Sequence, residues 1–170
     1  MKLLPTNYYL LPTKRRRRSG FSFIELLVVM GITAVIAGVA LISLLGRRST
    51  VELNTTSQKI AALLREAQSR SMVQASSSAW GVRFDNVTST APFYSLFGGA
   101  YSAASRENYY SMPSNLRFAT SSIAAGTYAA TTFEQVSGNT LGSTSIRIYM
   151  VNDPNSSTTI TIDPSGAVSY

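Results

Sequence analysis

Apolar residues are concentrated near the N-terminus of this 170-residue chain. Residues 21–45, FSFIELLVVMGITAVIAGVALISLL, form a continuous apolar run that contains one charge, Glu25. As an α-helix, this run would extend about 37 Å, which is longer than the ~30 Å of a bilayer hydrocarbon core. The pattern therefore predicts a membrane-spanning helix over residues 21–45.

Beyond this run, apolar residues continue at helical spacing but on one face only. The stripe consists of Leu53, Ile60, Leu64 and Ala67. Successive members are seven, four and three residues apart, which places them on one side of a helix. No proline interrupts residues 13–91. We therefore expect one continuous helix from about residue 21 to about residue 72, with an amphipathic second half over residues 46–73.

After the segment QASSSA at 74–79, short apolar runs alternate with turn-forming residues. The expected strands lie within residues 79–85, 92–99, 115–122, 131–139 and 144–154, followed by a closing hairpin at 158–170. Alternation such as Ile146, Ile148 and Met150 predicts antiparallel strands with one face in water. The expected fold class is α+β: a long N-terminal membrane-spanning and amphipathic helix packed on an antiparallel β-rich head at 74–170.

Charge separates the N-terminal segment from the rest of the chain. Residues 1–20 carry six basic side chains and no acid, whereas the other 150 residues carry nine basic and eight acidic ones. Most of this basic charge lies in Lys14 and Arg15, Arg16, Arg17 and Arg18. A basic segment before an apolar span predicts a cytoplasmic N-terminus and a head on the far side of the membrane. A nearly neutral body does not favour nucleic acid as a partner.

The chain contains no cysteine and no histidine. It therefore lacks disulfides, thiolate metal sites and the commonest nucleophile–base pairs. We expect a protein that is not an enzyme and that has no catalytic residue, cofactor or metal site.

Three simple interpretations apply to RRRRSGFSFIELLVVMGI at residues 15–32. A secretory signal peptide would be cleaved after Ala37 or Ala40, but it needs neither so long a basic region nor a charge in its apolar run. A plain membrane anchor leaves Glu25 unexplained, because an ionisable group inside a membrane is costly. A basic patch for anionic lipid explains the arginines but neither Gly20 nor Glu25.

A fourth interpretation explains the arginines, the glycine and the glutamate together. Cleavage between Gly20 and Phe21 on the cytoplasmic side would remove the basic leader and leave a positive amine on Phe21. A buried carboxylate needs a partner. The Phe21 amine of a neighbouring helix could supply that partner to Glu25, so that docking would neutralise both charges.

The segment RRSGFSFIELLVVMGITAVIAG resembles the N-terminal processing motif of type IV prepilins and type II secretion pseudopilins. The family motif is a basic leader ending in Gly, then Phe, three further residues, Glu and an apolar span. The resemblance implies that prepilin peptidase removes residues 1–20, cleaving after Gly20, and N-methylates Phe21. It also implies that Glu25 meets the N-terminal amine of an adjacent subunit during assembly.

The same resemblance implies partners and a location. The expected partners are the prepilin peptidase/methyltransferase, other pilin or pseudopilin subunits, an inner-membrane assembly platform and membrane lipid. The subunit would be held in the cytoplasmic membrane, with its head outside, before it enters an extracellular or periplasmic filament. The chain has neither a proline in the span nor a cysteine pair, and residues 63–85 resemble the helix-to-strand transition of minor pilins and minor pseudopilins.

Two further groups have alternative interpretations. Residues 152–156, NDPNS, carry oxygen ligands that could hold calcium, as in some pseudopilins, but this composition is also that of an ordinary turn. An aromatic group could stack on single-stranded nucleic acid, or could form part of the head or of a subunit contact. Its members are Tyr94, Phe97, Tyr101, Tyr109, Tyr110 and Phe118. A tip pilin that binds DNA or a surface remains the alternative function, although the C-terminal IDPSGAVSY has no basic residue.

Overall fold

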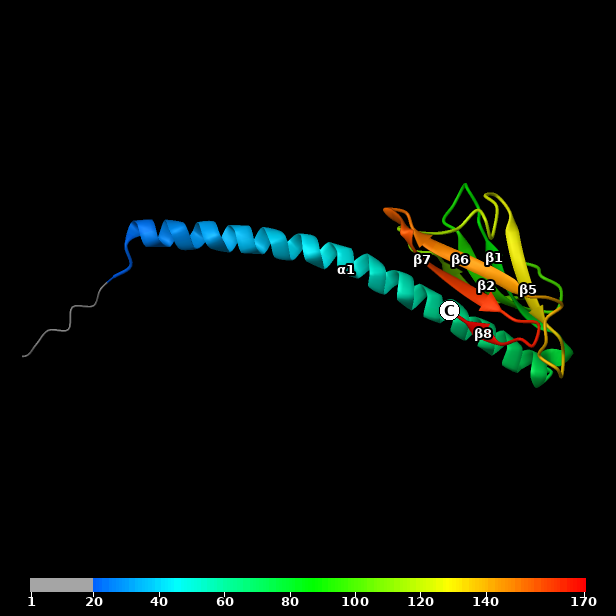
Figure 1. Ribbon diagram of the computed structural model, residues 1–170. Helices are drawn as coiled ribbons and strands as arrows, with labels where there is room; N and C mark the ends of the chain where they lie inside the picture. The colour runs from blue at the N-terminus through cyan, green and yellow to red at the C-terminus, as the bar shows by residue number, and fades with distance from the viewer. Residues whose placement is uncertain (1–19) are drawn as a thin grey trace, which may run out of the picture. The chain divides into compact units, whose positions relative to one another are not determined.

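The computed structural model describes residues 20–170, with the backbone alone for residues 41–48. The basic leader residues Lys14 and Arg15–Arg18 lie outside the described residues. The chain divides between Leu41 and Ile42 into an N-terminal unit and a larger C-terminal unit. One helix, α1 (Phe23–Met72), begins in the first unit and ends in the second (Figure 1).

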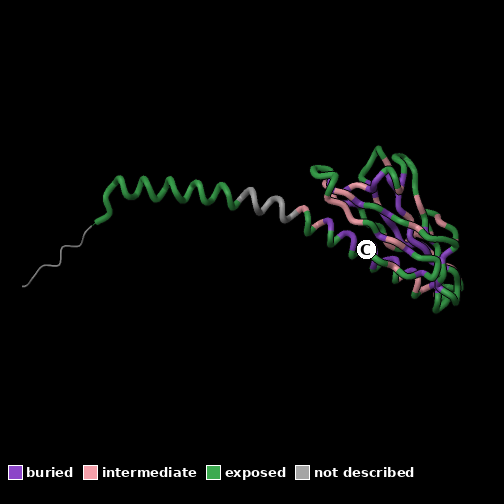
Figure 2. Tube along the Cα trace, in the orientation of Figure 1, coloured by how far each residue is buried: buried purple, intermediate pink, exposed green. Residues whose placement is uncertain are grey.

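The N-terminal part of α1 has the features of a membrane helix. The segment Phe23–Ala40 is long and apolar enough to span a bilayer, with a mean hydropathy of 2.4 and no buried residue (Figure 2). The Thr33 hydroxyl donates to the carbonyl oxygens of Val29 at 2.9 Å and Met30 at 3.0 Å. This polar group is therefore satisfied within the helix, as a hydrocarbon environment requires.

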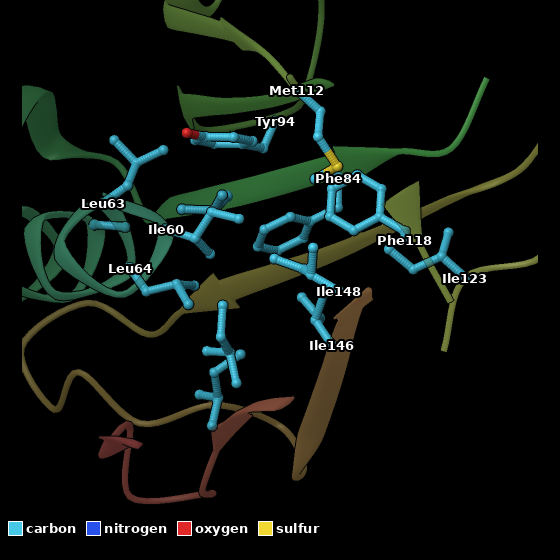
Figure 3. Close-up of a cluster of buried hydrophobic side chains, with 14 of the residues drawn as sticks. Ile60, Leu63, Leu64, Phe84, Tyr94, Met112, Phe118, Ile123, Ile146 and Ile148 are labelled. Carbon is cyan, nitrogen blue, oxygen red and sulfur yellow. The ribbon is translucent and has the colours of Figure 1, made fainter. Parts of the chain in front are cut away.

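The C-terminal part of α1 uses its apolar stripe to build the head. The predicted stripe of Leu53, Ile60, Leu64 and Ala67 is confirmed, because each of these side chains is at most 4% exposed. Figure 3 shows Ile60, Leu63 and Leu64 facing a set of strand side chains. Burial of each large aliphatic side chain contributes roughly 1.5–3 kcal/mol, so this face holds the helix on the head.

The segment QASSSA ends the helix, as predicted. A short 3₁₀ turn, η1 (Ala75–Ser77), follows α1, and Gln74, Ser76 and Ser77 adopt left-handed φ values of 53°, 55° and 52°. Trp80 fixes the exit from this turn. Its backbone N–H donates to the Ser71 hydroxyl at 2.7 Å, and its indole N–H donates to the Ala75 carbonyl oxygen at 2.8 Å.

The head contains two four-stranded antiparallel sheets. The first has the order β3-β2-β1-β5 and the second the order β4-β6-β7-β8. The first sheet comprises β1 (Trp80–Asp85), β2 (Phe93–Gly98), β3 (Arg106–Ser111) and β5 (Tyr128–Phe133). The second comprises β4 (Leu116–Phe118), β6 (Thr144–Met150), β7 (Asp153–Ile162) and β8 (Val168–Ser169). The α+β fold class is confirmed.

Three strand predictions differ from the structure. The edge strand β3, RENYYS, was not predicted, because its charged and polar side chains lack the alternation of a half-buried strand. Strand β5 begins at Tyr128, before the expected segment at 131–139, and ends at Phe133; the turn expected at the end of that segment is present, with Val136 at φ 69°. Strand β7 begins at Asp153, within a segment whose composition indicated a turn.

The expectation that each strand has one face in water holds for β6 and fails for β1. Strand β6 alternates as predicted, with Ile146, Ile148 and Met150 buried. Strand β1 is buried on both faces except for a half-buried Arg83. Aromatic side chains cover its outer face: the Arg83 guanidinium carbon lies 4.2 Å from the Tyr101 ring centroid and 3.6 Å from that of Tyr128.

Arg83 is also fixed by an acid on its own strand. Its Nε and Nη2 donate to the two carboxylate oxygens of Asp85 at 2.7 and 2.9 Å. Hydrogen bonding to Asp85 raises the pKa of Arg83, and the charge of Asp85 acts in the same direction. The pair is therefore neutral overall and fills the outer face of β1.

The core lies between the stripe of α1 and the inner faces of both sheets (Figure 3). Phe84 of β1 and Phe118 of β4 meet edge to face, with ring centroids 5.9 Å apart. Ile148 of β6 belongs to the same cluster as Ile60 of α1. The helix and both sheets therefore share one hydrophobic core.

The C-terminal hairpin closes against α1, and Figure 1 shows β8 beside this helix. Arg65 Nη2 donates to the carbonyl oxygen of Val168 at 3.0 Å, and Gln68 Nε2 donates to that of Gly138 at 3.2 Å. Gly166, with φ 81°, lies so close to this contact that a Cβ would be 2.2 Å from the Gly138 carbonyl oxygen. Only glycine fits both the backbone conformation and the space at residue 166.

Candidate functional site

The predicted processing residues lie immediately before α1. Gly20 and Phe21 are exposed, and the Phe21 side chain is 83% accessible. The helix begins two residues later, and the Leu26 N–H donates to the Ser22 carbonyl oxygen at 3.1 Å. A Cβ added at Gly20 would meet no atom within 4 Å. Packing in the described chain therefore does not require glycine at this position.

Glu25 occupies the first turn of α1. This position favours a carboxylate, because the unpaired N–H groups of a helix N-terminus carry partial positive charge. Within the described residues, the Glu25 side chain has no cation within ion-pair distance and no side-chain hydrogen bond. It is an acid without a side-chain partner on an otherwise apolar and exposed helix surface.

Next to this acid lies an open apolar hollow lined by Phe21, Leu26, Val29 and Met30. No polar atom contributes to its surface. The structure thus places the predicted cleavage junction, the acid and an apolar face at one end of α1. Such an end can dock against the apolar face of another helix through van der Waals contact, and it carries a charge that still needs neutralising.

Residues 15–41 match the family model described as the prokaryotic N-terminal methylation motif. The fold is similar to that of the type IV minor pilin FimU from Pseudomonas aeruginosa strain PAO1, in the crystal form of space group P21. That match has a TM-score of 0.50 and 15% sequence identity, and covers 69% of this chain and 87% of that chain. The chain thus carries this methylation motif at residues 15–41, and its fold is pilin-like.

A second crystal form of FimU, in space group P65, matches this pilin-like chain with a TM-score of 0.49 and 15% identity, covering 69% of this chain and 90% of that chain. No curated protein matches it. The likeness to FimU shows a pilin-like fold, and the matched motif is one of N-terminal methylation. The matched motif includes the apolar segment Phe23–Ala40, which is long enough to span a membrane.

The structure does not bring the aromatic group together on one surface. Tyr94, Phe97 and Phe118 are buried, each at most 3% exposed. Burial raises the pKa of Tyr94 to about 12, with a smaller contribution from the charge of Tyr110. Tyr109 and Tyr110 are exposed on the edge strand β3. The interpretation that these aromatic side chains form part of the head is therefore confirmed for Tyr94, Phe97 and Phe118.

The segment 152–156, considered above as a calcium loop or an ordinary turn, lies at the start of β7, which begins at Asp153. The Asp153 carboxylate accepts a hydrogen bond from the Ser156 hydroxyl at 2.5 Å, within the same segment. Residues 20–170 contain no cluster of three or more acidic side chains that could hold a metal ion. This local hydrogen bond is the ordinary chemistry of a turn.

The second sheet carries a polar hollow that was not predicted from the sequence. It is lined by Ala119, Thr120, Ser121, Arg147, Tyr149 and Pro154 and has a volume of about 190 Å³. The sequence signal for this hollow is that Arg147 and Tyr149 alternate with buried residues of β6, so that both lie on the outer face of the sheet. The contribution of residues 119–121 could not be foreseen, because it depends on the pairing of β4 with β6.

Proposed function

We propose that this protein is a structural subunit, a pilin or minor pseudopilin, of a type IV pilus or a type II secretion-like filament. The observation that carries the proposal is the end of α1. A cleavage motif adjoins a helix whose span Phe23–Ala40 is wholly exposed and apolar, with Glu25 in its first turn. That surface requires lipid before assembly and other helices after it.

Processing occurs between Gly20 and Phe21. Because a side chain at residue 20 would clash with nothing in residues 20–170, the glycine serves recognition by the peptidase. Cleavage removes the basic leader, residues 1–20, from the cytoplasmic side. The new amine on Phe21 is then N-methylated, which keeps its positive charge.

Assembly neutralises Glu25 against the Phe21 amine of an adjacent subunit. A carboxylate within a membrane costs about 2–3 kcal/mol on insertion scales, and less near the interface. Helix packing provides most of the contact area, and the charge pair sets the register between subunits. The subunit waits in the cytoplasmic membrane with its head outside, and the assembly platform moves it into the filament.

The mass of the mature N-terminus tests the processing step. In cells that express prepilin peptidase, we expect a chain that begins at methylated Phe21. A chain that retains Met1, or that begins near Leu41, contradicts the proposal. Gly20→Ala is the matched variant: it should leave the head folded and block cleavage.

The role of Glu25 is tested by filament yield after processing. Glu25→Leu should leave cleavage and head folding intact and reduce incorporation into filaments at least about tenfold, because one uncompensated charge remains at each contact. Glu52→Gln, outside the predicted span, is the control and should assemble normally. Normal assembly of Glu25→Leu would refute the amine–carboxylate pairing while leaving the membrane-subunit assignment intact.

A further inference from the structure

The outer face of the second sheet carries a small hollow that the assembly function does not use. Its walls come from the turn after β4 (Thr120 and Ser121), from β6 (Arg147 and Tyr149) and from β7 (Pro154). Its volume of about 190 Å³ suits a single sugar ring or one side chain. It is an open, shallow hollow on the surface of the head.

Arg147 supplies positive charge to the hollow. Its Nε and Nη2 donate to the Ser157 hydroxyl at 3.1 and 2.9 Å, which fixes the guanidinium beside β7. No acid in the described part of the chain lies within ion-pair distance of Arg147. Because a guanidinium has five N–H donors, the Nη1 side remains available for an oxyanion.

The turn after β4 adds further donors to the hollow. Ser122 and Ile123 donate their N–H groups to the Ala119 carbonyl oxygen at 2.9 Å. The backbone N–H groups and hydroxyls of Thr120 and Ser121, in contrast, have no protein partner among the described residues. Both residues line the same hollow as Arg147.

The position of the turn is fixed by the sheet below it. The Ala119 N–H donates to the Arg147 carbonyl oxygen at 2.8 Å, and the Arg147 N–H donates to the Ser122 hydroxyl at 3.2 Å. The turn and the guanidinium are therefore held on the same residue of β6. This arrangement pre-organises the donors, which lowers the entropic cost of binding.

No acidic residue lines the hollow. The nearest acid in sequence, Asp153, accepts a hydrogen bond from Ser156. Tyr149 and Pro154 contribute an aromatic ring and an apolar ring to the walls. The hollow thus combines one cation, several hydroxyl and N–H donors and flat apolar surface.

We infer that this hollow binds the carboxylate of an acidic sugar, a hexuronate unit. One guanidinium matches a carboxylate in charge and in its bidentate geometry, whereas a phosphate dianion would require further positive charge. The sugar ring, rather than a peptide side chain, accounts for the additional donors: Thr120, Ser121 and Tyr149 can bond ring hydroxyls. The apolar walls at Tyr149 and Pro154 accept the C–H face of the ring.

The inference does not rest on the proposed function, because every residue involved lies in the head. If it is correct, the head recognises acidic polysaccharide. The amine–carboxylate contact of α1 plays no part in this recognition. A filament subunit that failed to bind uronate would still assemble, and a chain that failed to assemble would still bind it.

Calorimetric titration of the purified full-length chain in detergent micelles tests the site. The probes are sodium glucuronate, glucose and N-acetylglutamate. We expect saturable binding of glucuronate, with glucose and N-acetylglutamate each at least about tenfold weaker, since each lacks one half of the recognised chemistry. Binding of glucuronate should weaken as salt rises.

Arg147→Met should reduce glucuronate affinity at least about tenfold, because it removes a charge-assisted contact. Arg117→Met is the matched control. Its guanidinium lies on the neighbouring strand β4, donates to the carbonyl oxygens of Ser114 and Leu116, and does not line the hollow. Arg117→Met should bind like the parent chain, and thermal unfolding checks that both variants are folded.

Three outcomes would overturn the inference. The first is no saturable binding of glucuronate by the folded parent chain. The second is equal binding of N-acetylglutamate, which would indicate a peptide partner instead of a sugar. The third is equal loss of affinity in the Arg117→Met control, which would place binding elsewhere on the sheet.

Discussion

The two halves of α1 share one backbone conformation and differ in what surrounds them. In Phe23–Ala40 no residue is buried, and apolar side chains cover the whole circumference. In the second half, Ile60, Leu64 and Ala67 are completely buried by the sheets. The difference shows that the head supplies its own apolar environment to one half, whereas the other half must find lipid or other helices.

The largest contrast is expected from matched leucine substitutions. Leu64→Ala removes a side chain with no exposed surface, and should lower the free energy of unfolding of the head by about 3–4 kcal/mol through lost burial and a cavity. Leu27→Ala, at a side chain that is 54% exposed, should leave head stability unchanged. Chemical denaturation monitored by the single tryptophan, Trp80, measures both. Equal destabilisation would show that the two halves unfold as one unit.

Matched glycine substitutions should give the next largest contrast. Gly166→Ala forces a side chain into left-handed backbone and against the Gly138 carbonyl oxygen, and should destabilise the head by about 2–3 kcal/mol. Gly38→Ala meets no atom within 4 Å and should improve helix propensity without affecting the head. Thermal unfolding in micelles distinguishes the two. A tolerated Gly166→Ala would mean that the C-terminal hairpin is not held against Gln68.

Alkaline pH should affect the head through Tyr94. Because burial raises its pKa to about 12, from an ordinary value near 10, the neutral phenol is the form that the folded state favours. The associated stability is fully present below pH 10 and is lost as the pH rises through about 12, to a total of about 3 kcal/mol. Tyr94→Phe should remove this part of the pH dependence, whereas Tyr109→Phe should retain it. Unfolding free energies between pH 9 and 12.5 provide the measurement.

The smallest expected effect concerns the charged contact at the end of α1. Arg70 forms ion pairs with Glu66, at 2.6 Å, and with Glu107 of β3, and its guanidinium carbon lies 4.6 Å from the Trp80 ring centroid. Partial burial alone would lower the pKa of Arg70, but hydrogen bonds and charge from Glu107 and Glu66 outweigh it and raise the pKa.

Arg70→Met should cost the head about 1 kcal/mol, since all three side chains are partly exposed to solvent. The difference from the parent chain should shrink in 1 M salt, where surface ion pairs are screened. Glu25→Gln, in the other half of the helix, should not change head stability at either salt concentration. A salt-independent cost at Arg70 would assign its contribution to packing on Trp80 instead of to charge.

The sequence predicted those elements whose signals are local. The helix stripe at Leu53, Ile60 and Leu64 followed from spacing alone, and the alternation in β6 identified its buried face. The edge strand β3 was not predicted, because it is held by its pairing with β2 and its own composition gives no strand signal. The two-sided burial of β1 was missed because Tyr101 and Tyr128 reach its outer face from distant positions.

The candidate sites also divide into one with a local sequence signal and one without. Gly20, Phe21 and Glu25 form a contiguous motif, so the sequence could locate them, and the structure adds that Glu25 lacks a side-chain partner among the described residues. The hollow around Arg147 assembles from three separate segments and had no contiguous signal. Its donors come together because the pairing of β4 with β6 places the turn at 119–122 beside β6.

The shared core has a consequence for the order of folding during export. Leu64 of α1 emerges early in synthesis, but Ile160 and Ile162 of β7, in the same cluster, emerge near the end. Contacts of such long sequence separation form slowly. In the proposed topology, the apolar stripe therefore remains uncovered while the strands cross the membrane. A chain interrupted before β6 would present this stripe to chaperones or proteases on the far side.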